Sequence, residues 1–319
     1  MHTGLDIKTL IQQRADFYRK IREYFQQQNA LEVEVPVIGR SGPTDLHLAS
    51  MSILSGGTRY YMQTSPEFFM KRLLAQGSGD IFSIGKAFRE AEAGSRHNPE
   101  FSMLEWYRLG YELPGIMADV QSLVRCFLPD MEFETKAYAE VFEAHLGLNP
   151  HSATDIELAE LVSNNTDFRG KLDRPGCLDL LMSTCIEPTL RDGAFFLFDF
   201  PACQAAMAQV APDNLGHQVA RRFELYIDGV EIANGYLELT DVTEQRRRFE
   251  ADNRARESSG LEKLPIDEQF LQALYQMPAC SGVALGLDRL LWLLCRDKGL
   301  IEDSRMNLEQ VLLFPWHRL

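Results

Sequence analysis

The sequence lacks the cysteine patterns of disulfide scaffolds and zinc sites, because it has six cysteines in 319 residues and no Cys-x-x-Cys pair. Scattered cysteines among apolar neighbours are typical of buried, reduced thiols. No apolar run is long enough to cross a membrane, since the richest segment, 282–294, is interrupted by Asp288 and Arg289. The first residues also lack the apolar core of a signal peptide, so we expect a cytoplasmic protein without a membrane segment.

Basic residues are scarce as well. The chain has 32 lysines and arginines against 46 aspartates and glutamates, a formal net charge of −14. This excess of negative charge disfavours non-specific binding to the phosphate backbone of a nucleic acid, although a local strip of basic residues could still bind one. With 45% hydrophobic and 24% charged residues, the composition excludes disorder and supplies a sizeable core. Because no linker, repeat or low-complexity tract divides it, we expect a single domain over 1–319.

The apolar pattern predicts the order of the main elements. A stripe through Ile11 and Phe25 predicts a first helix, which Asn29 would end in a left-handed conformation. Signals over 134–190 are weak, and we expect a helical insertion there. Further predicted elements are a strand from Leu31 that ends at Pro36, a helix over 65–76, a hairpin over 80–109 with a long polar loop over 89–98, and a second hairpin over 219–239.

A tight turn at Asp228-Gly229 determines which residues of its two strands share a face. A two-residue loop pairs Tyr226 with Glu231 and Glu224 with Ala233, and paired residues lie on the same side of a sheet. Glu224 and Glu231 therefore point the same way, where two carboxylates repel unless a cation lies between them. Oxygen ligands suit Mg²⁺ that carries phosphates, but a solvated sheet face accounts for the same pattern equally well.

Three further places could bind a charged ligand. Period two places Glu105 and Tyr107 on one strand face, and a carboxylate beside a phenol suits a primary ammonium. The loop cations Arg89 and His97 precede an aromatic residue, as a triphosphate and its purine would require, although a solvated charged loop is commoner. Arg289 opens a helix, where an anion is favoured. The glycines around it form neither a P-loop nor a G-x-G-x-x-G motif.

Three separated segments resemble the motifs of class II aminoacyl-tRNA synthetases. LEVEVPVI (31–38) resembles motif 1, AFRE (87–90) with RHNPEFSMLEWY (96–107) resembles motif 2, and GVALGLDRLLWLL (282–294) resembles motif 3. With RFELYIDGVEIANGYLEL (222–239), the match runs from about Arg14 to the end and is closest to the catalytic domain of lysyl-tRNA synthetase. The resemblance implies an α+β fold, an antiparallel sheet flanked by helices, and a homodimer interface at motif 1.

Lysyl-tRNA synthetases carry an anticodon-binding domain before this region, whereas here only a short segment precedes the first helix. A catalytic domain of this length, carrying YMQTSPEFFMKRLLAQGSGDIFSIGKAFR (61–89), is similar to the family of elongation factor P lysine ligases. That family activates (R)-β-lysine as an adenylate and transfers it to a lysine ε-amine of elongation factor P. The resemblance therefore implies ATP and Mg²⁺ as cofactors and a protein acceptor, with tRNA disfavoured.

The resemblance also implies roles for particular residues. The attacking group would be the carboxylate of the substrate, so catalysis would consist of positioning and charge stabilisation by Arg89 and Arg289. The positions that match the family's motifs give three sets of binding residues. ATP would bind to Arg89, Glu90, Ala91, His97, Asn98, Phe101, Glu231, Ile232, Gly286 and Arg289. The amino acid would bind to Ser65, Pro66, Glu67, Glu105, Tyr107, Asn234, Glu238 and Ala284, and Mg²⁺ to Glu224 and Glu231.

Two positions depart from lysyl-tRNA synthetases. Ala91 stands where those enzymes usually have a glutamate, so Glu90 or Glu92 would replace that contact or it is lost. Ala284 replaces a usual glycine, and its methyl group would disfavour α-lysine and leave room for a displaced β-amine. Two other functions compete with the ligase: a lysine-binding regulator without catalysis, which the intact set of charged residues disfavours, and a lysyl-adenylate former that charges tRNA.

Overall fold

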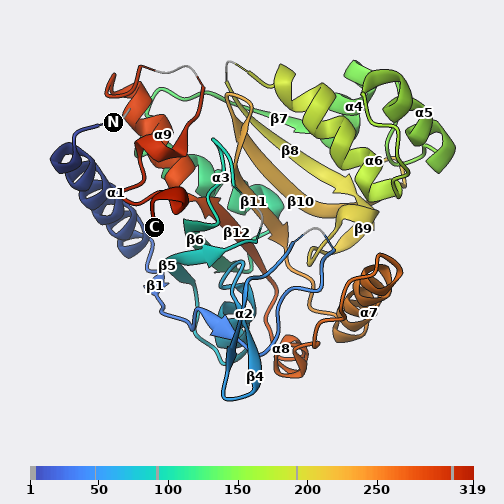
Figure 1. Ribbon diagram of the computed structural model, residues 1–319, viewed down its shortest axis with the longest axis horizontal. Coiled ribbons are helices and arrows are strands. Elements are labelled where there is room, and N and C mark those ends of the chain that lie inside the picture. Colours follow the sequence, from blue (N-terminus) through green and yellow to red (C-terminus); the bar gives the residue numbers. More distant parts are fainter. Residues whose placement is uncertain (1–4, 47, 91–92, 192, 303–304) are drawn as a thin grey trace. The chain divides into compact units, whose positions relative to one another are not determined.

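The computed structural model describes residues 5–46, 48–90, 93–191, 193–302 and 305–319 (Figure 1). The chain has two compact units. The first contains the residues up to Gly110, Ser122–Leu128 and Thr240–Leu319, and the second contains Tyr111–Gln121 and Pro129–Leu239. Compact units of this kind also occur inside single domains, so the single domain stays a prediction. Within the described ranges, no helix combines the length and the apolar character that crossing a membrane requires.

The main sheet of the first unit is built around the predicted hairpin. β5 (Ile81–Phe88) pairs antiparallel with β6 (Glu100–Leu109), and β6 pairs antiparallel with β12 (Cys280–Gly286). The short β1 (Leu31–Glu32) adds a parallel edge to β5. Helices flank these strands, so the expected α+β class with a largely antiparallel sheet is confirmed.

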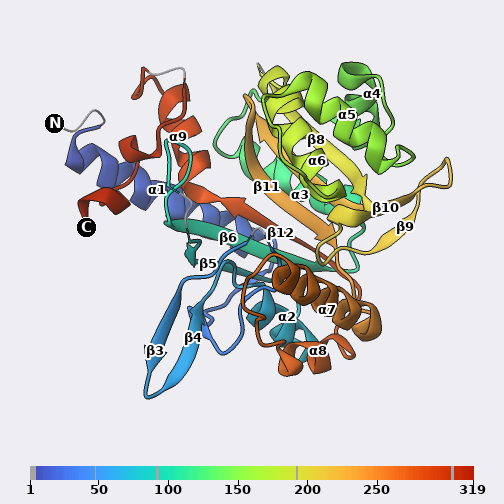
Figure 2. The same cartoon turned by 45° about the vertical axis from the view of Figure 1, so that its right-hand side comes forward.

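The predicted strand from Leu31 to Pro36 was too long, because only Leu31–Glu32 lies in a ladder. After Pro36 the chain enters a smaller sheet of the first unit through β2 (Ile38–Gly39). β2 pairs with β4 (Thr58–Met62), which forms a hairpin with β3 (Ser52–Ser55). This hairpin projects from its neighbours in Figure 2.

The first helix, α1 (Ile7–Gln27), is longer than the predicted stripe. Asp6 caps its start by accepting from the backbone N–H groups of residues 8 and 9, both at 3.1 Å. Asn29 follows its end with a φ of 56°, which confirms the predicted left-handed stop. The stripe was wrong at Ile11, which is 52% exposed, because the buried face uses Leu10 instead.

The other helices of the first unit lie later in the chain. α2 begins at Glu67 directly after Pro66, and no side chain caps it, so the predicted start at Ser65 was two residues early. α9 carries the leucines predicted to face the core, and it lies beside α1 in Figures 1 and 2. The bounds are α2 (Glu67–Ala75), α7 (Val242–Ser258), α8 (Glu268–Leu274) and α9 (Leu287–Asp297).

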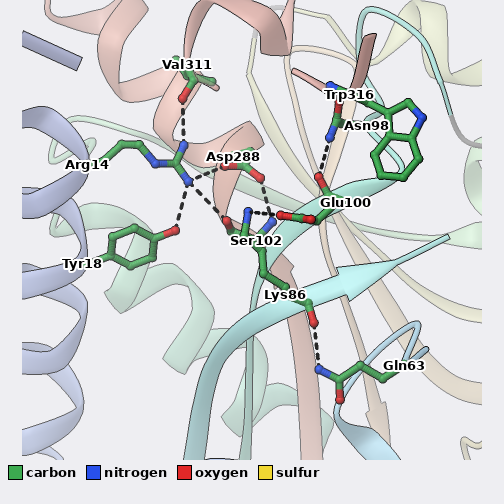
Figure 3. Close-up of polar contacts among 10 residues, drawn as sticks. All are labelled: Arg14, Tyr18, Gln63, Lys86, Asn98, Glu100, Ser102, Asp288, Val311 and Trp316. Carbon is green, nitrogen blue, oxygen red and sulfur yellow. Dashed lines mark hydrogen bonds and ion pairs between the residues drawn. The ribbon is translucent and has the colours of Figure 1, made fainter. Parts of the chain in front are cut away.

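A buried ion pair joins the two ends of the chain to the motif 2 hairpin (Figure 3). Arg14 of α1 donates to Asp288 of α9 at 2.8 Å and to the carbonyl oxygen of Val311 at 2.8 Å. The other oxygen of Asp288 accepts from the backbone N–H of Ser102 in β6 at 2.7 Å. Tyr18 lies 3.1 Å from the same guanidinium. Because Asp288 is buried and only 12% of the Arg14 side chain is exposed, the network holds α1, β6 and α9 in one arrangement.

The second unit has its own, mainly antiparallel strands. β10 (Gln218–Ile227) pairs antiparallel with β11 (Val230–Leu237) on one side and with β8 (Ala194–Pro201) on the other. β7 (Phe133–Ala137) extends β8 in parallel, and β9 (Val210–Pro212) pairs with the start of β10. The predicted magnesium residues, Glu224 and Glu231, and the predicted substrate residue Asn234 lie on β10 and β11.

Helices of the second unit cover one face of β8 and β10 (Figure 1). Their shared core contains Phe142, Leu178, Leu197 and Tyr226 among other buried side chains. Most of these helices lie within residues 134–190. Whether that segment is an insertion stays a prediction. The helices are α4 (Tyr138–Leu146), α5 (Asp155–Asn165) and α6 (Arg174–Leu181), with α3 (Leu113–Arg125) divided between the units.

Candidate functional site

The long loop of the β5–β6 hairpin carries the predicted phosphate-binding residues. Its base is closed by a backbone hydrogen bond of 2.9 Å from Arg89 to Pro99. Beside it, the backbone N–H of Glu90 donates to Ala49 at 2.9 Å, which anchors the loop to the segment before β3. Ala91, predicted to touch ATP, lies outside the described residues.

Arg89 and Phe101 meet at the base of this loop. The guanidinium carbon of Arg89 lies 5.1 Å from the centre of the Phe101 ring, a cation–π contact that fixes the long side chain. Arg289, in the first turn of α9, reaches the same loop by donating from Nε to the carbonyl oxygen of Arg96 at 3.4 Å. Gly286 directly precedes α9. The two predicted catalytic arginines and the aromatic platform thus come from three segments that meet around one hairpin.

Asn98, predicted to read the edge of adenine, is bound on both sides of its amide (Figure 3). Its Nδ2 donates to the carbonyl oxygen of Glu100 at 2.5 Å, and its Oδ1 accepts from the backbone N–H of Trp316 at 3.0 Å. These bonds tie the loop to the last residues of the chain. Each branch keeps one further hydrogen-bonding position, and reading of adenine by Asn98 stays a prediction, as does the role of the neighbouring His97.

Glu105 and Tyr107 form the predicted receptor for an ammonium group. Tyr107 donates to Oε1 of Glu105 at 2.7 Å, which confirms that the two side chains share a face of β6. Only 3% of Glu105 and 2% of Tyr107 is exposed, so the carboxylate is held away from bulk water. Ala284 lies directly across the β6–β12 ladder from Glu105. A methyl group therefore stands on the same face as the carboxylate.

Glu67 is paired with a lysine that sequence reasoning missed. Nζ of Lys71 lies 2.6 Å from Oε1 of Glu67, one turn earlier on α2, and 6.0 Å from the ring centre of Phe270. The Lys71 side chain is only 1% exposed, so it needs a compensating charge. The i, i+4 spacing of the two residues could have revealed the pair. Ser65 and Pro66 lead directly into this first turn of α2.

The turn between β10 and β11 is as predicted, but the register beyond it is not. Asp228 and Gly229 have positive φ angles of 51° and 73°, and Tyr226 pairs with Glu231. Between Leu225 and Tyr226 a β-bulge then adds one residue to β11, at Ile232. The predicted pairing of Glu224 with Ala233 was therefore wrong, because Glu224 lies opposite Asn234.

Glu224 and Glu231 still lie on the same side of the sheet with this corrected register. Tyr226, which pairs directly with Glu231, donates to Oε2 of Glu224 at 2.5 Å, so the side chains of all three residues lie on one side. Arg222, two residues before Glu224, donates to Oε1 of the same carboxylate. Burial raises the pKa of Glu224 to about 7, while Arg222 acts in the opposite direction.

The donors on this face fit a magnesium ion only in part. In the portion of the chain that the structure describes, no group of three or more His, Cys, Asp or Glu side chains is arranged to hold a metal. Two carboxylates nevertheless suit a cation that takes its other oxygen ligands from phosphates and water. Glu224 and Glu231 thus fit Mg²⁺ bound with ATP, rather than a site made by protein alone.

The remaining predicted residues of the second unit lie on or beside β11. Asn234 accepts at Oδ1 from Nε of Arg222 at 3.3 Å. Glu238 is 1% exposed, and its backbone bridges to Ala208. Sequence reasoning missed Arg222, although its spacing of two from Glu224 on a strand could have identified it.

The Lys71–Glu67 pair generates a stability prediction. Lys71→Met is expected to lower the free energy of unfolding by roughly 3–5 kcal/mol, because it leaves a largely buried carboxylate without its counter-charge. Urea denaturation measures the change. Lys263→Met is the matched control, since the Lys263–Glu257 ion pair is exposed and should cost at most about 1 kcal/mol. Equal losses of stability in the two variants would show that Lys71 is not needed to balance Glu67. The double variant Lys71→Met/Glu67→Gln should recover part of the stability lost in Lys71→Met.

Comparisons with known proteins identify the family. The profile of the tRNA synthetases class II (D, K and N) matches residues 3–318. The elongation factor P--(R)-beta-lysine ligase of Hamiltonella defensa is 41% identical over 318 residues, covering 96% of this chain and 94% of that protein. Proteins of the same name from Sodalis glossinidius and Yersinia pestis are each 44% identical, over 291 residues (88% and 89%) and 315 residues (95% and 93%). The resemblance drawn from the motifs is confirmed, and the chain belongs to the class II tRNA synthetase family (D, K and N).

Proposed function

We propose that this chain activates (R)-β-lysine with ATP and transfers it to the ε-amine of a lysine on elongation factor P. The observation that carries this proposal is similarity along nearly the whole chain to ligases named for that reaction. The Glu105–Tyr107 pair supports it, because a buried carboxylate oriented by a phenol is a receptor for a primary ammonium. The strongly acidic balance of the chain fits a protein acceptor better than tRNA.

The reaction needs no nucleophilic side chain. A carboxylate oxygen of β-lysine attacks the α-phosphorus of ATP and pyrophosphate leaves; the acceptor amine then attacks the activated carbonyl, and AMP leaves. Arg89 stabilises the charge that develops at the α-phosphate, Phe101 and Arg289 enclose the adenine, and His97 meets the outer phosphates. Mg²⁺ held by Glu224 and Glu231 would neutralise phosphate charge.

The amino acid is recognised through carboxylates at its amines and through an amide at its carboxylate. Glu105, Tyr107 and Glu238 receive the side-chain ammonium, while the amide of Asn234 holds the carboxylate. Glu67 receives the second amine beside Ser65 and Pro66. The Lys71–Glu67 ion pair supports this role, because a carboxylate already fixed by one ammonium is oriented before the second arrives.

Intact-mass measurement of elongation factor P tests the proposal. After incubation with this chain, ATP, Mg²⁺ and β-lysine, we expect one added lysyl group, formed faster than with α-lysine. An adduct on tRNA but not on the protein would favour the tRNA-charging alternative. Binding of lysine without adenylate formation would favour a regulator, and either result would contradict the proposal.

The same assay tests the role of Ala284. Ala284→Gly removes the methyl group opposite Glu105 and is expected to increase the rate with α-lysine while leaving that with β-lysine within about twofold. An unchanged ratio between the two amino acids would show that this methyl group does not set the preference.

We also propose that the chain acts in the cytoplasm, where it would meet a translation factor, and that it forms a homodimer. The homodimer is supported by exposed apolar side chains in the segments that resemble motif 1 and its helix: Ile7, Ile11 and Leu31 are 51%, 52% and 61% exposed. Sedimentation equilibrium should give a dimer, and Leu31→Glu should weaken it. A wild-type chain that stays monomeric at micromolar concentration would contradict this proposal.

A further inference from the structure

Arg222 contacts two residues of the candidate site that are assigned to different ligands. It donates to Oε1 of Glu224, which is proposed for Mg²⁺, and from Nε to Oδ1 of Asn234, which is proposed for the substrate carboxylate. Its third partner is the carbonyl oxygen of Gln204, at 2.8 Å. Nothing in the motif resemblance gives Arg222 a role.

The guanidinium is held rigidly in this place. Its carbon lies 4.5 Å from the ring centre of Phe200 and 6.0 Å from that of Tyr236, and 17% of the side chain is exposed. A planar guanidinium that stacks on a ring and donates to three acceptors has little rotational freedom. Its contacts therefore restrain the side chains of Glu224 and Asn234 as well.

The contact with Asn234 determines what that side chain presents to a ligand. An amide has an acceptor on one branch and two donors on the other. Because Oδ1 faces the guanidinium of Arg222, Nδ2 is the branch directed away from it. A carboxylate can be held only by the donor branch, and the flipped amide would present an oxygen that repels it.

We propose that Arg222 is a positioning residue for recognition of the substrate carboxylate. It acts through Asn234 by holding the amide in the orientation that donates, and it places a positive charge near the incoming carboxylate. The contact with Glu224 makes it a link between the carboxylate end of the amino acid and the residue proposed to carry the metal. This inference rests on the proposed function of Asn234 and deepens it.

Measurements of ligand binding test this positioning role independently of catalytic activity. Calorimetry with a non-hydrolysable ATP analogue and Mg²⁺ compares β-lysine with 1,4-diaminopentane, the same molecule without its carboxylate. The wild type should prefer β-lysine. Arg222→Lys keeps a charge beside Glu224 but cannot reproduce the fork of donors, so it should weaken β-lysine by roughly 10-fold and leave the diamine within about twofold.

A double-variant cycle tests the route through Asn234. Asn234→Ala should remove the preference for β-lysine, and adding Arg222→Lys to it should weaken binding no further. Independent, multiplying losses would overturn the inference, as would an Arg222→Lys variant that binds β-lysine like the wild type. A general loss of fold would weaken both ligands and the ATP analogue together, which also counts against a positioning role.

Arg221→Met is the matched control. Arg221 is the neighbour on the same strand, and its guanidinium bonds Asp199 at 3.0 Å, a residue that is not assigned to the candidate site. Its removal should leave the preference for β-lysine unchanged. If the wild type shows the preference but elongation factor P gains no mass, the proposed function fails while the inference about Arg222 stands; if the wild type shows no preference, the inference fails whatever the mass assay gives.

Discussion

A charge withdrawn from water needs a partner, and this constraint organises the parts of the chain that carry chemistry. Arg14 and Asp288 are paired across the ends of the chain, Lys71 and Glu67 along one helix turn, and Arg222 and Glu224 along one strand. An ion withdrawn from water without a partner costs several kcal/mol. Each pair therefore holds the backbone segments that bear it, and two of the three hold a carboxylate proposed to meet the substrate or its metal.

This pairing suits an enzyme that positions reactants and supplies no nucleophile. Hydrogen-bond donors and charges help catalysis most when they are oriented before the substrate binds. Tyr226 and Arg222 each bind one oxygen of Glu224, and Tyr107 binds Glu105 in the same manner. The Arg14–Asp288 network acts at longer range, because it joins β6, which carries Glu105, to α9, which carries Arg289.

Local rules predicted the features that depend on neighbours in sequence. The turn at Asp228-Gly229, the stop at Asn29 and the shared face of Glu105 and Tyr107 follow from turn chemistry and period two. The end of the strand at 31–32 depends on distant partners and was missed. The bulge that moves Asn234 opposite Glu224 was also missed, as were the cations that balance Glu67 and Glu224, although Lys71 and Arg222 are close neighbours of these glutamates in the sequence. The ligand assigned to each residue came from the motif resemblance, since residue types alone left solvated surfaces as alternatives.

The most direct test of the account is the rate of β-lysine-dependent exchange between pyrophosphate and ATP. The wild type should exchange only when Mg²⁺ and β-lysine are both present. Arg89→Ala should reduce the rate by roughly 100-fold or more, because it removes charge stabilisation at the α-phosphate. Arg19→Ala, which alters an exposed ion-pair residue of α1, should not change it. Exchange by Arg89→Ala at the wild-type rate would contradict the assignment of the site.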